Sequence, residues 1–366
     1  MTRTLRKLGL VPRYGPKMRT ADTGDAVGLT DRQQDVLRAA IRAYLGEATP
    51  IGSKHISHLL VKKLSSATIR ATLAELGALG MVQQPHASAG RVPTEQGLRT
   101  FIDHLLDRRD IAEYDRRAIE YHVDNAQSDT VVGVAAQLLS EQTRLLGFAV
   151  APRLERVTLQ HVSLVRLAAT RVLAVLVSST GAAYRRVITA DVDLDQRELD
   201  RVASHLTERA VGRTLPEVRD ALRREAAALH READRLLRWA VELGTRAVAP
   251  QDEEVDIVVA TRLAVLDQPE LRDPRRIREI LETLETKERL VEIIDEMIAG
   301  GGVAVALGGE MGEPALSHCA LVATRYGDEL APLGAVGVIG PSRMDYSRVI
   351  PLVAFCSRAI TDKLLG

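Results

Sequence analysis

Hydrophobic residues recur at three- and four-residue intervals in three segments between residues 29 and 79, which predicts three amphipathic helices. Thr30, Ser53 and Ser65 stand at the starts of these segments, where a hydroxyl side chain can cap a helix. Two short extended pieces then flank the small-residue stretch 85–90, which predicts a β-hairpin. A further helix follows. Three helices and then a hairpin are the element order of a winged helix-turn-helix.

The remainder of the chain alternates between helical and extended patterns. A helical stretch at 110–145 precedes a set of strands, two charged helices cover 195–211 and 216–243, and strands and helices return after residue 267. Strands are predicted at 146–150, 157–165, 172–178, 182–189, 302–307, 319–326 and 333–339. We expect the later strands to complete a sheet that begins before residue 190. The predicted fold class is therefore α+β and multidomain, with a domain that is interrupted by helices.

One of the charged helices carries leucines at a heptad spacing, at Leu222, Leu229, Leu236 and Leu243. Alanines lie three positions before the last three of these leucines, so the seam would let another helix approach closely. The pattern leaves open whether that helix belongs to a second subunit or to the same chain.

Charge is distributed unevenly along the 366 residues, although the formal net charge is zero. Residues 1–110 carry 17 Lys and Arg against 10 Asp and Glu, and the rest of the chain has the opposite excess. A basic N-terminal part indicates binding to a polyanion. Because only 3% of residues are aromatic, a single-stranded nucleic acid, which is usually bound by stacking, is disfavoured. Double-stranded DNA is the expected partner.

In a winged helix-turn-helix the third helix enters the major groove, where base edges can be read. Arg70 could then read guanine or hold a phosphate, Thr68 could contact a base edge, and Arg91 would lie on the wing. Lysines near the helix start would contact phosphates. The residues expected to contact DNA are Ser53, Lys54, Lys62, Lys63, Ser65, Ser66, Thr68, Arg70, His86, Ser88 and Arg91.

Some of these residues also have a simpler interpretation. Ser65 and Ser66 are helix caps in the first place, and Lys62 with Lys63 could be an ordinary solvated loop. His55 and His58 are three residues apart, but no nearby Cys, Asp or Glu completes a ligand set, so no metal is expected.

The later segments suggest neither an enzyme nor a cofactor. The glycine-rich stretch 308–312 lacks the Lys-Ser/Thr of a phosphate loop, and no catalytic set is recognisable by spacing. The strand-to-helix junction at 340–346 could be an anion pocket, although a turn with helix-capping residues is the favoured interpretation. Cys319 and Cys356 are expected to be small core residues rather than nucleophiles.

Two cysteines cannot form a disulfide framework, and no apolar run is long enough to span a membrane. Residues 1–27 are basic, lack the apolar centre of a secretory signal and are expected to form a disordered extension. We therefore expect a cytoplasmic protein with no membrane contact.

The chain closely resembles the heat-inducible transcription repressor HrcA family of bacteria in four segments: 64–70 (LSSATIR), 84–94 (QPHASAGRVPT), 269–274 (PELRDP) and 334–350 (GAVGVIGPSRMDYSRVI). The resemblance covers residues 29–366 and is weak only within 195–265. It implies a dimeric repressor of class I heat-shock operons, those of chaperones and the chaperonin. Such a repressor binds an inverted-repeat operator, is modulated by the chaperonin and loses activity on heat shock.

The resemblance also implies a domain order. It comprises an N-terminal extension (1–27), a winged-helix DNA-binding domain (28–106), the first part of a GAF-like α/β domain (107–194), a mainly helical inserted dimerisation domain (195–265) and the second part of the GAF-like domain (266–366). Two alternatives remain at this point. One is a winged-helix regulator whose GAF-like domain senses a small molecule, and the other is an α/β enzyme with a basic accessory domain.

Overall fold

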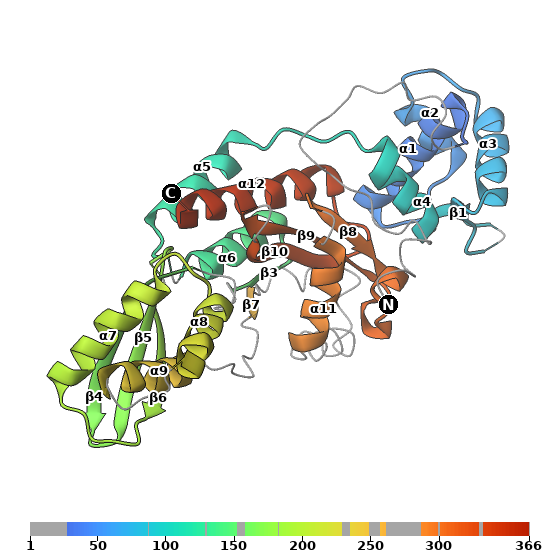
Figure 1. Cartoon of the computed structure of the whole chain (residues 1–366). Helices are drawn as coiled ribbons and strands as arrows, with labels where there is room; N and C mark the ends of the chain where they lie inside the picture. Colours follow the sequence, from blue (N-terminus) through green and yellow to red (C-terminus); the bar gives the residue numbers. More distant parts are fainter. Residues whose placement is uncertain are drawn as a thin grey trace.

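The computed structural model describes residues 28–86, 88–128, 130–151, 158–181, 183–228, 235–248, 257–260, 287–298, 301–328 and 332–365. Figure 1 shows three units in a row: an N-terminal helical unit, a central sheet with helices on both faces, and a smaller sheet covered by helices. The predicted extension 1–27 and the PELRDP segment lie outside the described residues.

The N-terminal unit has the predicted element order. Its elements are α1 (Asp31–Glu47), α2 (Ser53–Leu59), α3 (Ser66–Ala78), β1 (Val82–Gln83), β2 (Val92–Pro93) and α4 (Glu95–Thr100). Thr30 caps α1 in a capping box with Gln33, and Thr94 caps α4 through the amide of Gly97. The hairpin pairs β1 with β2 in antiparallel register, and Ile51 bridges Arg91 as a third strand one residue long. This is a winged helix-turn-helix.

The central unit is an antiparallel sheet in the strand order β7-β3-β10-β9-β8. Its strands are β3 (Leu146–Val150), β7 (Ile257–Ala260), β8 (Ala304–Leu307), β9 (Cys319–Gly327) and β10 (Pro332–Pro341). Helices α6 (Val131–Thr143) and α12 (Tyr346–Leu365) cover one face, and α11 (Lys287–Ile298) covers the other. Helix α5 (Glu113–Asn125) packs on α6 and α12. Because both faces are buried, β9 is apolar at nearly every position and its alternate residues belong to two separate cores.

The third unit consists of β4 (Leu159–Ala168), β5 (Arg171–Ser178), β6 (Ala183–Thr189) and the helices α7 (Gln196–Ala210), α8 (Leu215–Ala228) and α9 (Arg235–Ala247). The three strands form an antiparallel sheet of their own. The Thr207 hydroxyl on α7 bonds both the amide and the carbonyl of Val162 on β4. Strand β4 therefore packs in the same unit as α7, and the predicted boundary between residues 194 and 195 divides this unit.

The third unit lies between strands of the central sheet in chain order, because β3 precedes it and β7 to β10 follow it. The assignment of β4–β6 to the first part of the interrupted central domain was wrong. Hydrophobic alternation identifies a strand and its buried face, but it does not say which sheet the strand joins.

The leucine positions lie on two helices rather than on the single predicted one, with Leu222 on α8 and Leu243 on α9, and they pack inside the third unit where they are described. Leu222, Ala240 and Leu243 are buried, and a Cβ added at Gly244 would lie 2.6 Å from Cδ2 of Leu206. Leu229 is outside the described residues. The intrachain alternative therefore holds for these positions. None of the described helices is both long and apolar enough to cross a bilayer.

Candidate nucleic-acid interface

Helix α3 is anchored by one face and leaves the other open. Ile69, Leu73 and Leu76 are buried against α1 and α2. The opposite face holds the exposed residues Ala67, Arg70, Ala71 and Ala74, at the spacing of a single helix side. In Figure 1, α3 forms the outer edge of the molecule, on the side away from the central sheet. Small side chains let this helix backbone approach a partner closely, with Arg70 as the one long cationic side chain among them.

Serine hydroxyls organise the N-terminus of α3. Ser65 caps the helix, because its Oγ accepts a hydrogen bond from the Thr68 amide at 3.0 Å and lies 2.8 Å from the Thr68 hydroxyl. The Ser53 and Ser66 hydroxyls are 2.9 Å apart, which joins the first turns of α2 and α3. The predicted capping role is confirmed for Ser65. The free amides and positive dipole end of α3 also favour a phosphate at this point.

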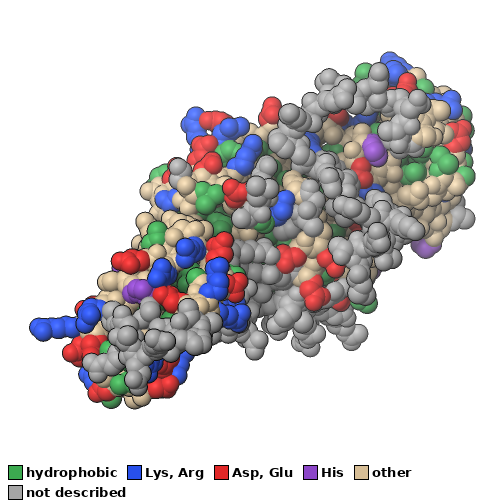
Figure 2. All heavy atoms as spheres, viewed as in Figure 1, with side chains coloured by type: hydrophobic (Ala, Val, Ile, Leu, Met, Phe, Trp, Pro, Cys, Tyr) green, Lys and Arg blue, Asp and Glu red, His purple; other side chains and the backbone are tan. Residues whose placement is uncertain are grey.

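The predicted lysines surround this helix start. Lys54, Lys62 and Lys63 are exposed. Lys62 Nζ lies 3.9 Å from the carboxylate of Asp35, so part of its charge is already compensated. Lys63 has no ion pair within the described part of the chain. Figure 2 shows Lys and Arg side chains at the outer edge of this unit.

The wing is fixed at its base and exposed at its tip. Ile51 and Arg91 exchange two backbone hydrogen bonds of 2.9 Å, and Gln84 donates to the Ala89 carbonyl at 3.0 Å. His86 and Ser88 are exposed at the tip. Arg91 is half-buried, and its Nη1 lies 3.9 Å from where a Cβ on Gly77 would stand. The structure therefore places Arg91 beside the C-terminal half of α3 rather than at the tip.

Other candidate chemistry is absorbed into structure. His55 Nε2 lies 3.1 Å from the carboxylate of Glu47, and the described residues hold no group of three or more His, Cys, Asp or Glu placed to share a metal. Burial raises the pKa of the Cys319 thiol to about 11 and that of Cys356 to about 12. Neither thiol ionises near neutral pH, which agrees with the predicted core roles.

The junction 340–346 is occupied by internal contacts. Ser342 Oγ donates to the Cys319 carbonyl at 3.1 Å, and the Tyr346 hydroxyl donates to the Ser342 carbonyl at 2.6 Å. The Asp345 carboxylate accepts from Ser347 Oγ at 2.5 Å. These bonds favour the turn interpretation over an anion pocket.

Comparison with known proteins agrees with this geometry. Residues 28–103 match the family model described as "Winged helix-turn-helix transcription repressor, HrcA DNA-binding", and residues 129–350 match "HrcA protein C terminal domain". The heat-inducible transcription repressor HrcA of Xylella fastidiosa (strain M23) is 34% identical over 336 residues, which is 92% of this chain and 96% of the relative. That of Xanthomonas euvesicatoria pv. vesicatoria (strain 85-10) is 35% identical over 89% of this chain and 93% of the relative.

A crystal structure of a hypothetical protein has the same fold, with a TM-score of 0.61 and 23% identity over 92% of this chain and 98% of that one. The family models together span the winged helix and most of the remaining chain. The protein belongs to the HrcA family of heat-inducible, winged-helix transcription repressors, which are not enzymes.

Proposed function

We propose that this repressor acts as a homodimer on an inverted-repeat operator in front of class I heat-shock operons, those of chaperones and the chaperonin. The exposed outer face of α3, with Arg70 among alanines, is the observation that carries the proposal. This face has the shape and charge to enter a major groove, where an Arg can bond guanine in a bidentate manner. The repressor would act in the cytoplasm, where the operator lies.

The predicted DNA contacts fall into two groups on this surface. Arg70 and Thr68 would lie against base edges, and the α3 N-terminus with Lys54, Lys62 and Lys63 would lie against phosphates. The wing tip, with His86 and Ser88, would contact the backbone or the minor groove beside it. The predicted contacts also include three serines that are hydrogen-bonded to one another or to Thr68: Ser53, Ser65 and Ser66. We therefore propose that these serines fix the N-terminus of α3 and act on DNA through the position of that helix end.

A second copy of the chain is proposed to dock on the outer face of the β4–β5–β6 sheet. The strand register places Val165 opposite Leu173 and Leu173 opposite Val187, so an apolar row crosses all three strands. Val165 and Val187 are 40% and 50% exposed. Helices α7 and α9 pack on the other face, where Figure 2 shows charges of both signs interspersed. An apolar row on an exposed sheet face is typical of a surface that a partner covers.

Two-fold symmetry connects the dimer to the operator. A dimer presents two copies of α3 related by a two-fold axis, and an inverted repeat presents two half-sites with the same relation.

Heat would act on the same dimer, because a marginally stable native state loses binding-competent dimer on warming. The chaperonin would return misfolded chains to the active pool, so its shortage during stress would release the operator.

Footprinting on the promoter of the chaperonin operon of the source organism tests this proposal. We expect symmetric protection of an inverted repeat by a species that sediments as a dimer. Protection of a single half-site, or none at micromolar protein, would contradict it. In a second arm the protein is heated, cooled and titrated with and without chaperonin. Full operator occupancy through the heat-shock range, with unaided refolding, would overturn the heat and chaperonin part alone.

A further inference from the structure

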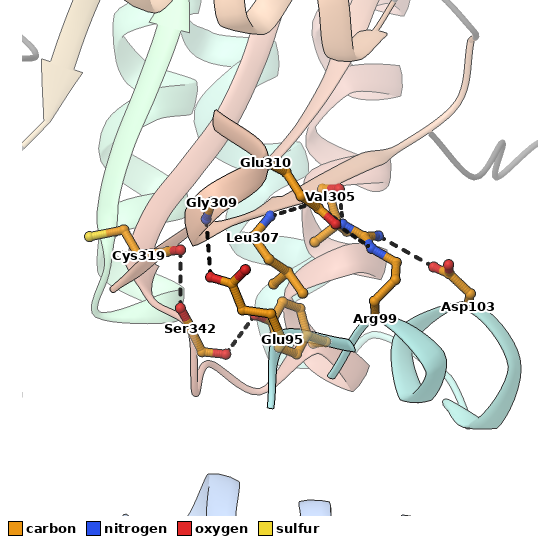
Figure 3. A network of polar contacts seen from close by, with 10 residues as sticks. Glu95, Arg99, Asp103, Val305, Leu307, Gly309, Glu310, Cys319 and Ser342 are labelled. Atoms are coloured by element: carbon orange, nitrogen blue, oxygen red, sulfur yellow. Dashed lines mark hydrogen bonds and ion pairs between the residues drawn. The ribbon is translucent and has the colours of Figure 1, made fainter. Parts of the chain in front are cut away.

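The winged-helix domain is joined to the central domain by a half-buried ion pair between α4 and a short turn after β8. Arg99 Nε donates to one oxygen of Glu310 at 3.0 Å, and its Nη2 pairs with the other oxygen. The same Nη2 donates to the Val305 carbonyl at 2.8 Å, and Nη1 lies 3.4 Å from Asp103. Figure 3 shows the contacts from the guanidinium to Glu310, Val305 and Asp103. The pair joins residues 211 positions apart.

A second contact lies beside the first. The Glu95 carboxylate accepts a hydrogen bond from the Gly309 amide at 3.0 Å, as Figure 3 also shows. A Cβ added at Gly308 would lie 2.3 Å from the Glu95 Oε1 and 2.2 Å from the Ser317 carbonyl oxygen. The 3-10 turn Gly308–Met311 therefore needs glycine in order to seat the Glu95 side chain. The glycine-rich stretch 308–312 therefore serves to accommodate the Glu95 side chain.

The joint is built to be rigid. The Arg99 and Glu310 side chains are only 17% and 18% exposed, and Glu310 also accepts from the Leu307 amide at 2.8 Å. Burial alone would lower the pKa of Arg99, but its hydrogen bonds and charge interactions with Glu310 and Asp103 raise it. A bidentate guanidinium–carboxylate pair fixes orientation as well as distance. Removing Glu310 would leave Asp103 as the carboxylate beside the half-buried Arg99 guanidinium, and removing Arg99 would take this cation away from the half-buried Glu310 carboxylate.

The connecting segment reinforces the same arrangement. The Arg109 amide donates to the Ser347 carbonyl at 3.1 Å, and Arg348 of α12 bonds the nearly buried Asp115 of α5 at 3.0 Å. In Figure 1, α4 lies on the side of the winged-helix domain that faces the central sheet. The central unit in turn lies between α3 and the β4–β6 sheet.

We propose that Arg99, Glu310 and Glu95 are positioning residues for operator binding, which set where α3 stands relative to the dimer without touching DNA. This inference rests on the proposed function. A dimer must hold its two recognition helices at the separation of the two half-sites, which is one DNA turn, roughly 34 Å, or a multiple of it. If α4 were free to swing, the second half-site would be met at a much lower effective concentration. Because these contacts fix the winged-helix domain relative to the dimer, the dimer should prefer operators with one particular half-site spacing.

The test titrates full-length wild type and Glu310→Gln against three DNA classes: the intact operator, a single half-site, and operators with the spacer changed by one or two base pairs. We expect Glu310→Gln to bind the intact operator about tenfold more weakly, with half-site affinity changed less than about twofold. The spacing preference should flatten. Arg99→Lys keeps the charge but loses the bidentate geometry, so its operator affinity should lie between those of the wild type and Glu310→Gln.

Glu113→Gln is the matched control, because it makes the same change at the exposed Glu113–Arg117 pair within α5. Circular dichroism and sedimentation verify the fold and the dimer. If Glu310→Gln does not fold, Glu95→Gln decides, since it removes only the charge that meets the Gly309 amide.

Unchanged affinity and spacing preference would overturn the proposal. So would a parallel loss on half-site and operator, which indicates damage to the winged helix, or tighter operator binding, which indicates that the contact holds α3 away from DNA. Failure of the proposed function is distinguishable, because the wild type itself would then show no operator binding.

Discussion

Ile51 and Arg91 exchange a pair of backbone hydrogen bonds, each 2.9 Å long, and this single bridge attaches the wing to the segment before α2. The bridge brings Gly90 so close that an added Cβ would lie 2.6 Å from the carbonyl carbon and oxygen of Ile51. The wing is thus held to the helical core by backbone packing that tolerates no side chain.

Gly90→Ala is therefore expected to destabilise the winged helix by about 1–3 kcal/mol, because backbone atoms must move to admit the methyl group. Operator affinity should fall as well, since the wing shifts. The matched control is Gly46→Ala in α1, where nothing lies within 4 Å of the added Cβ. It should gain about 0.5–1 kcal/mol from helix propensity. Urea unfolding of both variants measures the difference, and equal stabilities would refute this account of the wing.

The elements of the winged helix could be predicted because their signals are local. Capping hydroxyls and a 3.6-residue period lie within a few residues of the structure they specify, and Ser65 was identified from its neighbours alone. The same phase predicts that Arg70 is exposed. The β-bridge at Ile51 could not be predicted, because a strand one residue long shows no alternation of hydrophobic and polar positions.

Contacts between distant segments could not be predicted from pattern. Nothing near Arg99 indicates that its partner is Glu310, and nothing within β4–β6 indicates a separate sheet. Arg91 was expected on the wing surface, but its side chain is half-buried near α3. In each case tertiary packing decides, and the local pattern of hydrophobic and polar residues carries no signal of it.

Arg70→Ala should weaken operator binding by about 1–3 kcal/mol and relax the base preference at one position of each half-site, because Arg70 is the one long side chain on the outer face of α3. Arg70→Lys separates the two parts of this effect, since it retains a charge for phosphate but cannot form the bidentate bond. Titrations against single-base operator variants measure both. A uniform loss across all variants would reassign Arg70 to a phosphate.

Lys63→Ala should act mainly on salt dependence. Removal of one phosphate contact is expected to reduce the slope of log affinity against log salt by about 1, with base preference unchanged. Lys62→Ala is the informative comparison, because Lys62 is already 3.9 Å from the Asp35 carboxylate and should change the slope less. Mobility-shift titrations at several salt concentrations provide the slopes. A larger effect at Lys62 than at Lys63 would contradict this ranking.

The two thiols predict a dependence of stability on alkaline pH. Burial raises the pKa of Cys319 to about 11 and of Cys356 to about 12, from an ordinary value of 9.0. The unfolded chain therefore loses these protons first, so their contribution to stability is complete below pH 9 and declines as the pH rises through the folded-state values. Urea unfolding from pH 8 to 10.5 should show the decline, and Cys356→Ala should reduce it. Rapid alkylation of either thiol in the native protein at pH 8 would show that it is not buried.

Val187→Asp tests the proposed dimer surface. Val187 is half exposed and lies in register with Leu173, which is itself opposite Val165. A carboxylate at this point costs the monomer little, because the site is open to water, but it would be desolvated against an apolar partner. We expect the dimer dissociation constant to rise at least about tenfold, which corresponds to about 1.4 kcal/mol. Operator affinity should fall, while the melting temperature of the monomer stays close to that of the wild type.

The control is Val211→Asp, at a valine that is 54% exposed where α7 ends, outside the apolar row. Sedimentation over a range of concentrations reports the dissociation constants. If both variants dimerise like the wild type, the second copy docks elsewhere. If both dissociate, the effect follows from added charge rather than from the row.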